Sequence, residues 1–197
     1  MLHGGDFTDF GTQQEYVWAL EILKDLRVPF FVTAGNHDML VNGPKVFDDM
    51  FGPSNYWFDW ARIKFVFFNT NTTELGEDHL DLDWLETTLA SEQPGRRSIV
   101  ITHHPPDSRP QIKPDETERY RQIQRDLGVI LNLHGHLHER TWAWQDGPTT
   151  YLRAAAALRS NFYVVSVQSN SVAYMHCVPA GCDPPGEVIP TWKPSPD

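Results

Sequence analysis

Four short apolar runs, separated by polar and helix-like segments, constrain the fold of this chain more than any other feature. The runs are Phe30–Ala34, Ile63–Phe68, Ser98–Thr102 and Val129–Leu133. Continuous apolar runs of this length are typical of strands that are buried on both faces, and strands that alternate with helices indicate a largely parallel sheet. We therefore expect an α/β fold, a mixed β-sheet sandwich flanked by helices.

Three segments have the apolar spacing of amphipathic helices. They are Gln13–Leu26, Leu82–Ala90 and Glu116–Leu127. Pro29 follows the first segment and Gly128 follows the third, and both residue types commonly end helices. These helices supply the cover that the sheet needs.

The last third of the chain has a weaker pattern. Three runs there are expected to be antiparallel strands that finish a sheet: Thr149–Arg153, Phe162–Val167 and Ser171–His176. The prolines and glycines from Pro179 onward predict an irregular tail. A chain of 197 residues fits a single core, so we expect one domain over residues 1–178 and a Pro-rich irregular tail over residues 179–197.

The net charge of the chain limits the kinds of partner it is expected to bind. A net charge of −10 argues against nucleic acid or an anionic membrane as the main partner, because both favour clustered Lys and Arg. No apolar stretch approaches the ~20 residues that span a bilayer, and Met1–Asp6 has no signal pattern. We expect a cytoplasmic protein. Cys177 and Cys182 are expected to be ordinary thiols or a staple of the tail.

Polar clusters rich in histidine follow three of the apolar runs. They are Gly35-Asn36-His37-Asp38, His103-His104-Pro105-Pro106 and His134-Gly135-His136-Leu137-His138. In open α/β sheets, binding sites lie beyond the carboxyl ends of the strands. Alternate residues of an extended segment point the same way, so the 134–138 segment can aim several imidazoles at one metal ion. The spacing does not say which of its histidines bind.

A fourth cluster, Gly4-Gly5-Asp6-Phe7-Thr8-Asp9, precedes the others. The four clusters, in this order, resemble the later signature blocks of the calcineurin-like metallophosphoesterases, over residues 4–138. Within that family the chain looks most like bacterial cyclic-nucleotide and glycerophosphodiester phosphodiesterases. The resemblance implies a four-layer α/β sandwich and a centre of two divalent ions, Mn, Fe or Zn.

The resemblance also implies a role for each matching residue. Asp6 would bridge the two ions, while Asn36, His103 and His136 would hold the second ion and His138 the first. Two such ions activate a water that attacks phosphorus directly, so no covalent intermediate forms. His134 would bind neither ion.

His37 and Asp9 are the expected catalytic pair. Asp9 would orient His37, which would stabilise or protonate the leaving oxygen. The alternative for Asp9 is a turn or helix N-cap before Thr12–Glu15. His104 neighbours a ligand on an extended segment, so we expect it to face away from the ion, toward substrate or a supporting contact.

The chain departs from the family pattern at its start. The Asp-x-His block, which supplies two ligands to the first ion, does not occur before the first helix, and the first strand of the fold is expected to be missing. Either the printed chain begins internally in an ordinary dinuclear hydrolase, or a short form binds one ion and is weakly active or inactive. We favour the first, because Asp6, Asn36, His103, His136 and His138 are all present.

The combined prediction is metal-dependent hydrolysis of a phosphoester, more specifically of a small-molecule phosphodiester. Five aromatic residues lie in segments that could line the pocket and stack on the substrate, although ordinary packing explains most of them: Tyr56, Trp57, Trp60, Trp142 and Trp144. The rival is a metal-binding or interaction protein on an inactive phosphoesterase scaffold. The oligomeric state is not predicted by the sequence.

Overall fold

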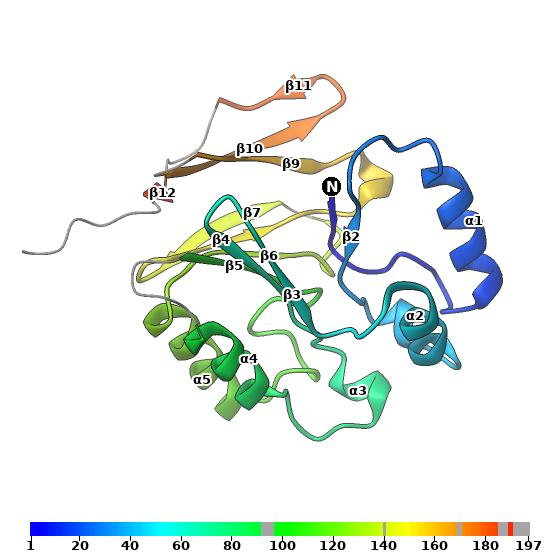
Figure 1. Ribbon diagram of the computed structural model, residues 1–197, viewed down its shortest axis with the longest axis horizontal. Helices are drawn as coiled ribbons and strands as arrows, with labels where there is room; N and C mark the ends of the chain where they lie inside the picture. Colours follow the sequence, from blue (N-terminus) through cyan, green and yellow to red (C-terminus); the bar gives the residue numbers. More distant parts are fainter. Residues whose placement is uncertain (92–96, 140, 169–170, 185–188, 191–197) are drawn as a thin grey trace, which may run out of the picture.

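Three of the four apolar runs, residues 63–68, 98–102 and 129–133, contribute strands to a six-stranded sheet at the centre of the molecule (Figure 1). The fourth run, residues 30–34, instead contributes a two-residue strand to a separate two-stranded sheet. The structure is a computed structural model, and it describes residues 1–91, 97–139, 141–168, 171–184 and 189–190. The strands are β3 (Tyr56–Trp60), β4 (Ile63–Phe67), β5 (Arg97–Ile101), β6 (Val129–His134), β7 (Trp142–Asp146) and β8 (Thr149–Arg153), in the spatial order β3-β4-β5-β6-β8-β7.

Strands β4, β5, β6 and β8 are parallel, and the edge strands β3 and β7 are antiparallel to their neighbours. The sheet is therefore mixed, as predicted. The expectation that Thr149–Arg153 is antiparallel to its neighbours is wrong on one side, because this strand runs parallel to β6. Parallel pairing brings the carboxyl ends of four strands to one edge.

Each central strand is buried on both faces because each face has its own cover. On one face, Val66 and Val100 pack against helices α4 (Leu82–Ala90) and α5 (Pro114–Asp126). On the other face, Phe67 and Ile101 belong to a cluster that includes Val172. This alternation of side chains along β4 and β5 explains why their sequences read as continuous apolar runs.

The second sheet is antiparallel and covers the face opposite α4 and α5 (Figure 1). It contains β9 (Phe162–Val167), β10 (Ser171–Val178), β11 (Gly181–Cys182) and β12 (Ile189–Pro190). Two of these short strands lie within residues 179–197, where we expected irregular structure. A disulfide joins Cys177 to Cys182, so these cysteines do staple the start of the tail.

The amino-terminal third forms a smaller unit beside the sandwich (Figure 1). Strands β1 (Leu2–His3) and β2 (Phe31–Val32) pair in parallel. Helix α1 (Gln13–Leu23) begins with the capping box of Thr12 and Glu15 and ends earlier than predicted. The sequence reading missed α2 (Gly43–Phe51) and the short helix α3 (Thr72–Leu75).

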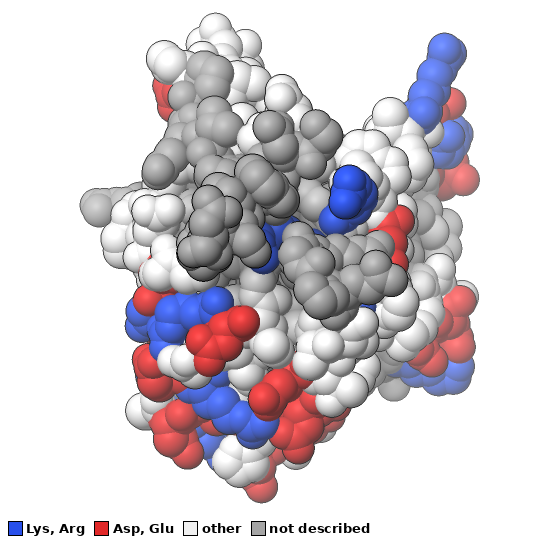
Figure 2. Space-filling view, turned by 60° about the vertical axis from the view of Figure 1, so that its left-hand side comes forward, with Lys and Arg blue, Asp and Glu red and all other residues white. Residues whose placement is uncertain are grey.

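Acidic and basic side chains intermix on the outer face of α4 and α5, the lower part of the face in Figure 2. Arg119 pairs there with Asp83 and Glu86 at 2.6 and 3.0 Å. In the part of the chain that the structure describes, no helix combines the length and apolar character needed to cross a bilayer.

Candidate metal centre

Four chain segments that are far apart in sequence meet at the carboxyl edge of the sheets. We call residues 4–9, after β1, the Asp6 loop, and residues 33–38, after β2, the Asn36 loop. His103 follows β5, and His136 follows β6. The parallel pairs β1-β2 and β5-β6 explain this meeting, because both members of a parallel pair end on the same side.

The Nε2 atom of His103 lies at the middle of the cluster. It is 3.1 Å from Asn36 Oδ1 and 3.2 Å from His136 Nδ1. It is also 3.3 Å from Asp6 Oδ2. Asn36 Oδ1 is in turn 3.1 Å from His136 Nδ1. The structure thus brings together four of the five predicted ligands, with one potential ligand atom of each pointing inward.

Two glycines permit the approach of the loops. A Cβ on Gly5 would lie 2.5 Å from Nδ1 of His103 and 2.8 Å from the Cα of Gly35. A Cβ on Gly35 would collide with the backbone nitrogen and the carboxylate of Asp6. Asp6 and His136 have positive φ angles of 53° and 64°, which non-glycine residues rarely adopt outside functional sites and turns.

A backbone contact selects the tautomer of His103. Its Nδ1 lies 2.8 Å from the carbonyl oxygen of Gly4, which can only accept a hydrogen bond. Nδ1 therefore carries a proton, and Nε2 is the ring nitrogen that faces Asp6, Asn36 and His136. Metal-binding histidines are commonly oriented in this way by a carbonyl group.

The electrostatics of the cluster favour the protonation states of metal ligands. Burial, reinforced by His103, lowers the pKa of His136 to about 4. Burial opposes ionisation of Asp6, but contacts with His103 and the backbone N–H of His37 outweigh it and lower the pKa of Asp6 to about 2. At neutral pH the site therefore offers a neutral imidazole and an ionised carboxylate.

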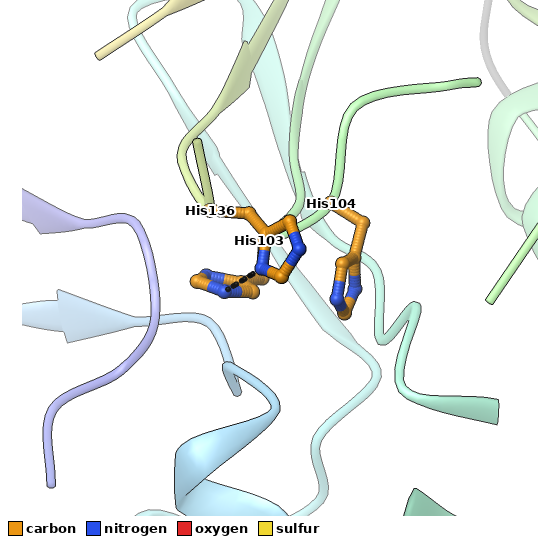
Figure 3. A group of neighbouring side chains, drawn as sticks. All are labelled: His103, His104 and His136. Atoms are coloured by element: carbon orange, nitrogen blue, oxygen red, sulfur yellow. Dashed lines mark hydrogen bonds between the residues drawn. The ribbon is translucent and has the colours of Figure 1, made fainter. Parts of the chain in front are cut away.

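His104 lies beside His103 and His136, contrary to our expectation that it faces away (Figure 3). Its ring centroid is 4.9 Å from that of His103 and 4.3 Å from that of His136. The strand ends at Ile101, so the alternation of an extended segment no longer applies at residues 103 and 104. Nδ1 of His104 contacts the hydroxyl of Thr70 at 3.1 Å.

The donor set fits a divalent transition metal. Among the residues that the structure describes, ligand atoms of His103, His104 and His136 lie within 4.8 Å of one another. The Nε2 atom of His104 is buried and has no hydrogen-bond partner among them. Imidazole, carboxylate and amide oxygen suit Mn, Fe or Zn. A bound cation would also offset the cost of packing these polar atoms together.

His37 and Asp9 are neighbours, as expected, but the closer contact is through the backbone. His37 Nδ1 lies 2.7 Å from the Asp9 carbonyl oxygen and 3.4 Å from its carboxylate. Partial burial lowers the pKa of His37, but the Asp9 carbonyl and the charge of Asp6 outweigh this and raise it overall. The N-cap of α1 is Thr12, so Asp9 does not serve as that cap.

The other histidines are placed differently. His134 is buried, and its Nδ1 lies 2.9 Å from Asn132 Oδ1, away from the centre. His138 is exposed in the turn after β6, so its predicted role as a metal ligand stays a prediction. His3 packs its ring edge-on against Phe7 at 5.4 Å, which agrees with a structural role.

Asp38 was missed as a site residue, although it belongs to the Gly35-Asn36-His37-Asp38 cluster. It is fully buried, and its carboxylate accepts hydrogen bonds from both loops. Burial raises the pKa of Asp38, although these hydrogen bonds act in the opposite direction. The available signal was an acidic residue two positions after a predicted ligand.

Trp142 and Arg153 form a pair at the edge of the six-stranded sheet that carries the centre. The guanidinium of Arg153 lies 5.4 Å from the Trp142 ring centroid, and 57% of Trp142 is exposed. Arg153 is the register partner of His134, two residues before His136. An exposed indole with a guanidinium group can stack on a planar group and attract an anion.

Comparison with known proteins places this chain in a family. Residues 1–140 match the family described as calcineurin-like phosphoesterase. The fold resembles that of a dimetal phosphatase from Danio rerio with a TM-score of 0.61 at 13% identity, covering 96% of this chain and 83% of the other.

Two curated relatives carry phosphodiesterase names. A 3′,5′-cyclic-nucleotide phosphodiesterase of Nostoc sp. (strain PCC 7120) is 27% identical over 148 residues, which is 71% of this chain and 55% of the relative. A probable glycerophosphodiester phosphodiesterase of Arcobacter nitrofigilis is 33% identical over 110 residues, which is 52% of this chain and 40% of the relative. The chain thus spans about half the length of these relatives.

Proposed function

Because the chain belongs to the calcineurin-like phosphoesterase family, we propose that it hydrolyses phosphoesters with the help of divalent metal ions held by Asp6, Asn36, His103 and His136. The observation that carries this proposal is the convergence of three side chains, those of Asp6, Asn36 and His136, on His103 Nε2, at distances of 3.1 to 3.3 Å. His138 is proposed as a further ligand on the basis of the family resemblance.

The residues of the proposed centre have separate roles in hydrolysis. When bound, divalent ions supply positive charge that attracts phosphate oxygens and makes water a stronger nucleophile. His103 and His136 present nitrogen ligands. Asp6 contributes a negative charge, while the Gly4 carbonyl fixes the orientation of His103. No side chain is needed as the nucleophile.

His37 is proposed to act on the leaving group. Its ring is partly exposed, and its Nδ1 is held by the Asp9 carbonyl at 2.7 Å. Nε2 therefore stays available to donate a proton to the departing oxygen. The raised pKa of His37 supports this role, because more of the imidazole is protonated at neutral pH.

The proposed substrate is a small-molecule phosphodiester. Both reported relatives are named as phosphodiesterases. Nucleic acid and membranes are not proposed as partners, because the chain carries a net charge of −10.

A cytoplasmic location was expected from the sequence, and it stays a prediction. The disulfide between Cys177 and Cys182 argues against it, because structural disulfides persist mainly in oxidising compartments. Quantifying free thiols in protein purified from cells under alkylating conditions would decide whether this bond forms where the protein works.

Hydrolysis of bis(p-nitrophenyl) phosphate by the manganese-loaded protein tests the proposal. We expect His136→Ala to lower the rate by at least about 100-fold, since it removes a ligand from the middle of the cluster. His79→Ala is the matched control, because His79 is an exposed histidine that contacts Glu116 of α5.

The outcome also separates the enzyme from its rival, a metal-binding protein without activity. Turnover that depends on His136 and is accompanied by bound manganese supports the enzyme. Tight binding of manganese without turnover above the His136→Ala background would contradict it. Metal analysis by mass spectrometry of the native protein would count the ions per chain.

A further inference from the structure

Asp38 joins the two loops that carry the oxygen ligands of the candidate centre. We propose that Asp38 is a positioning residue whose buried carboxylate sets the metal affinity of the centre by holding the Asp6 loop against the Asn36 loop. This inference rests on the proposed function, since it assumes that Asp6 and Asn36 bind an ion. In this proposal Asp38 does not contact the ion and affects its binding only by positioning Asp6 and Asn36.

The carboxylate of Asp38 accepts four hydrogen bonds. Oδ1 accepts from the backbone N–H of Thr8 at 2.8 Å and from its hydroxyl at 3.0 Å. Oδ2 accepts from the backbone N–H of Phe7 at 3.1 Å and from that of Gly35 at 2.9 Å. The three bonds from Phe7 and Thr8 connect the two loops, and only the bond from Gly35 lies within the Asn36 loop. Stabilising the turn at Gly35 therefore explains only one of the four bonds.

The two loops are joined by reciprocal hydrogen bonds, because each loop has a carboxylate that accepts from backbone N–H groups of the other. Asp38 of the Asn36 loop accepts from Phe7 and Thr8 of the Asp6 loop, while Asp6 accepts from the backbone N–H of His37 at 3.0 Å through Oδ1. The other oxygen of Asp6 is the one that lies 3.3 Å from His103 Nε2. The same contacts that join the loops therefore orient the inward-facing oxygen of Asp6.

The strands beneath the loops are too short to position them unaided. β1 and β2 contain two residues each, so their ladder supplies few hydrogen bonds. A hydrogen bond to an ionised acceptor is roughly twice as strong as a neutral one. Tyr16 of α1 adds a further anchor, because its buried hydroxyl donates to the Asp38 carbonyl at 3.1 Å.

Asp38→Asn tests the inference, because it keeps the size of the side chain. The new amide nitrogen would face N–H donors and lose hydrogen bonds from at least one oxygen. We expect the dissociation constant for Mn²⁺, measured by calorimetry, to rise about 10-fold to 100-fold, which is usual when a residue that supports metal ligands is replaced. Asp48→Asn, at an exposed position on α2, is the matched control and should leave it unchanged.

The measurement is made well below the unfolding temperature of each metal-free variant, so loss of fold is not mistaken for loss of affinity. Should Asp38→Asn fail to fold, Thr8→Val removes the hydroxyl that donates to Asp38 and accepts from the backbone N–H of Gly11, and roughly threefold to tenfold weaker binding is expected. Unchanged affinity in the folded variant would overturn the inference. Absence of Mn²⁺ binding by the wild-type protein would instead contradict the proposed function.

Discussion

The two halves of the candidate centre are built differently. His103 and His136 follow β5 and β6, which are long, central and buried strands. Asp6 and Asn36 follow β1 and β2, which have two residues each. The first half takes its geometry from the sheet, whereas the second takes it from hydrogen bonds between loops. The same edge of the molecule thus combines a rigid scaffold with loops that have to be held in place.

Among substitutions that test this difference between the two halves, Gly35→Ala is expected to have the largest effect on metal affinity and stability. The added Cβ would collide with the backbone and carboxylate of Asp6, so the Asp6 and Asn36 loops would separate. We expect affinity for Mn²⁺ to fall by roughly 100-fold and stability to fall by about 1–3 kcal/mol, as measured by calorimetry and thermal unfolding.

Gly4→Ala is the control for that variant. A Cβ on Gly4 meets no atom within 4 Å, so both properties should stay close to wild type. If Gly35→Ala bound Mn²⁺ as tightly as Gly4→Ala, the loops would tolerate more separation than this structure implies.

An intermediate effect, mainly on stability, is expected from Asn132→Leu. This substitution disturbs β6, the strand that precedes His136. Asn132 contacts Tyr120, Gln124 and His134 at 3.2, 2.9 and 2.9 Å. Removing a buried polar group leaves its hydrogen-bond partners unsatisfied, which lowers the free energy of unfolding by about 1–3 kcal/mol. The β6 backbone still positions His136, so metal affinity should change by less than about threefold.

Asn42→Leu serves as the control, because Asn42 is exposed and its side chain makes no capping hydrogen bond. Urea unfolding and Mn²⁺ titration of both variants give the result. A loss of affinity in Asn132→Leu as large as that of Gly35→Ala would show that the sheet does not hold its histidines rigidly.

The smallest effect is expected from Asp9→Asn. It alters the carboxylate 3.4 Å from His37 but keeps the carbonyl at 2.7 Å. Exposed ion pairs contribute little, so the rate at neutral pH should change by less than about fivefold. The raised pKa of His37 means that the rate should fall as pH rises through that pKa, and loss of the negative charge should move this fall to lower pH.

The pH profile of phosphodiester hydrolysis checks this expectation. His37→Asn should remove the decline entirely, because no imidazole is left to titrate. A decrease of more than about tenfold in Asp9→Asn at neutral pH would show that the carboxylate, and not the carbonyl, positions His37.

Local patterns predicted the parts of the fold that depend on local physics. The bounds of Thr149–Arg153 and Phe162–Val167 match the structure, because apolar patterns and turn residues act over a few positions. The direction of β8 relative to β6 was wrong, since pairing between distant strands is not encoded in either strand alone. Helix α2 was missed although Pro44 lies in its first turn, a usual position for proline.

The site shows the same division. Asp6, Asn36, His103 and His136 were identified from motifs, and the structure brings them together. The direction of His104 was predicted wrongly because the parity of a strand ends where the strand ends.

The sequence by itself determined the family, the α/β sandwich and the residue types of the candidate metal centre, because the order of the motifs and the apolar periodicity can be read directly along the chain. Only the tertiary structure decided how the proposed ligands are held. The Asp38 carboxylate accepts from Thr8 and the Asp6 carboxylate accepts from His37, so residues about thirty positions apart are joined through backbone N–H groups that every residue type except proline carries. Such contacts leave no pattern in a sequence, because their specificity lies in distance and burial.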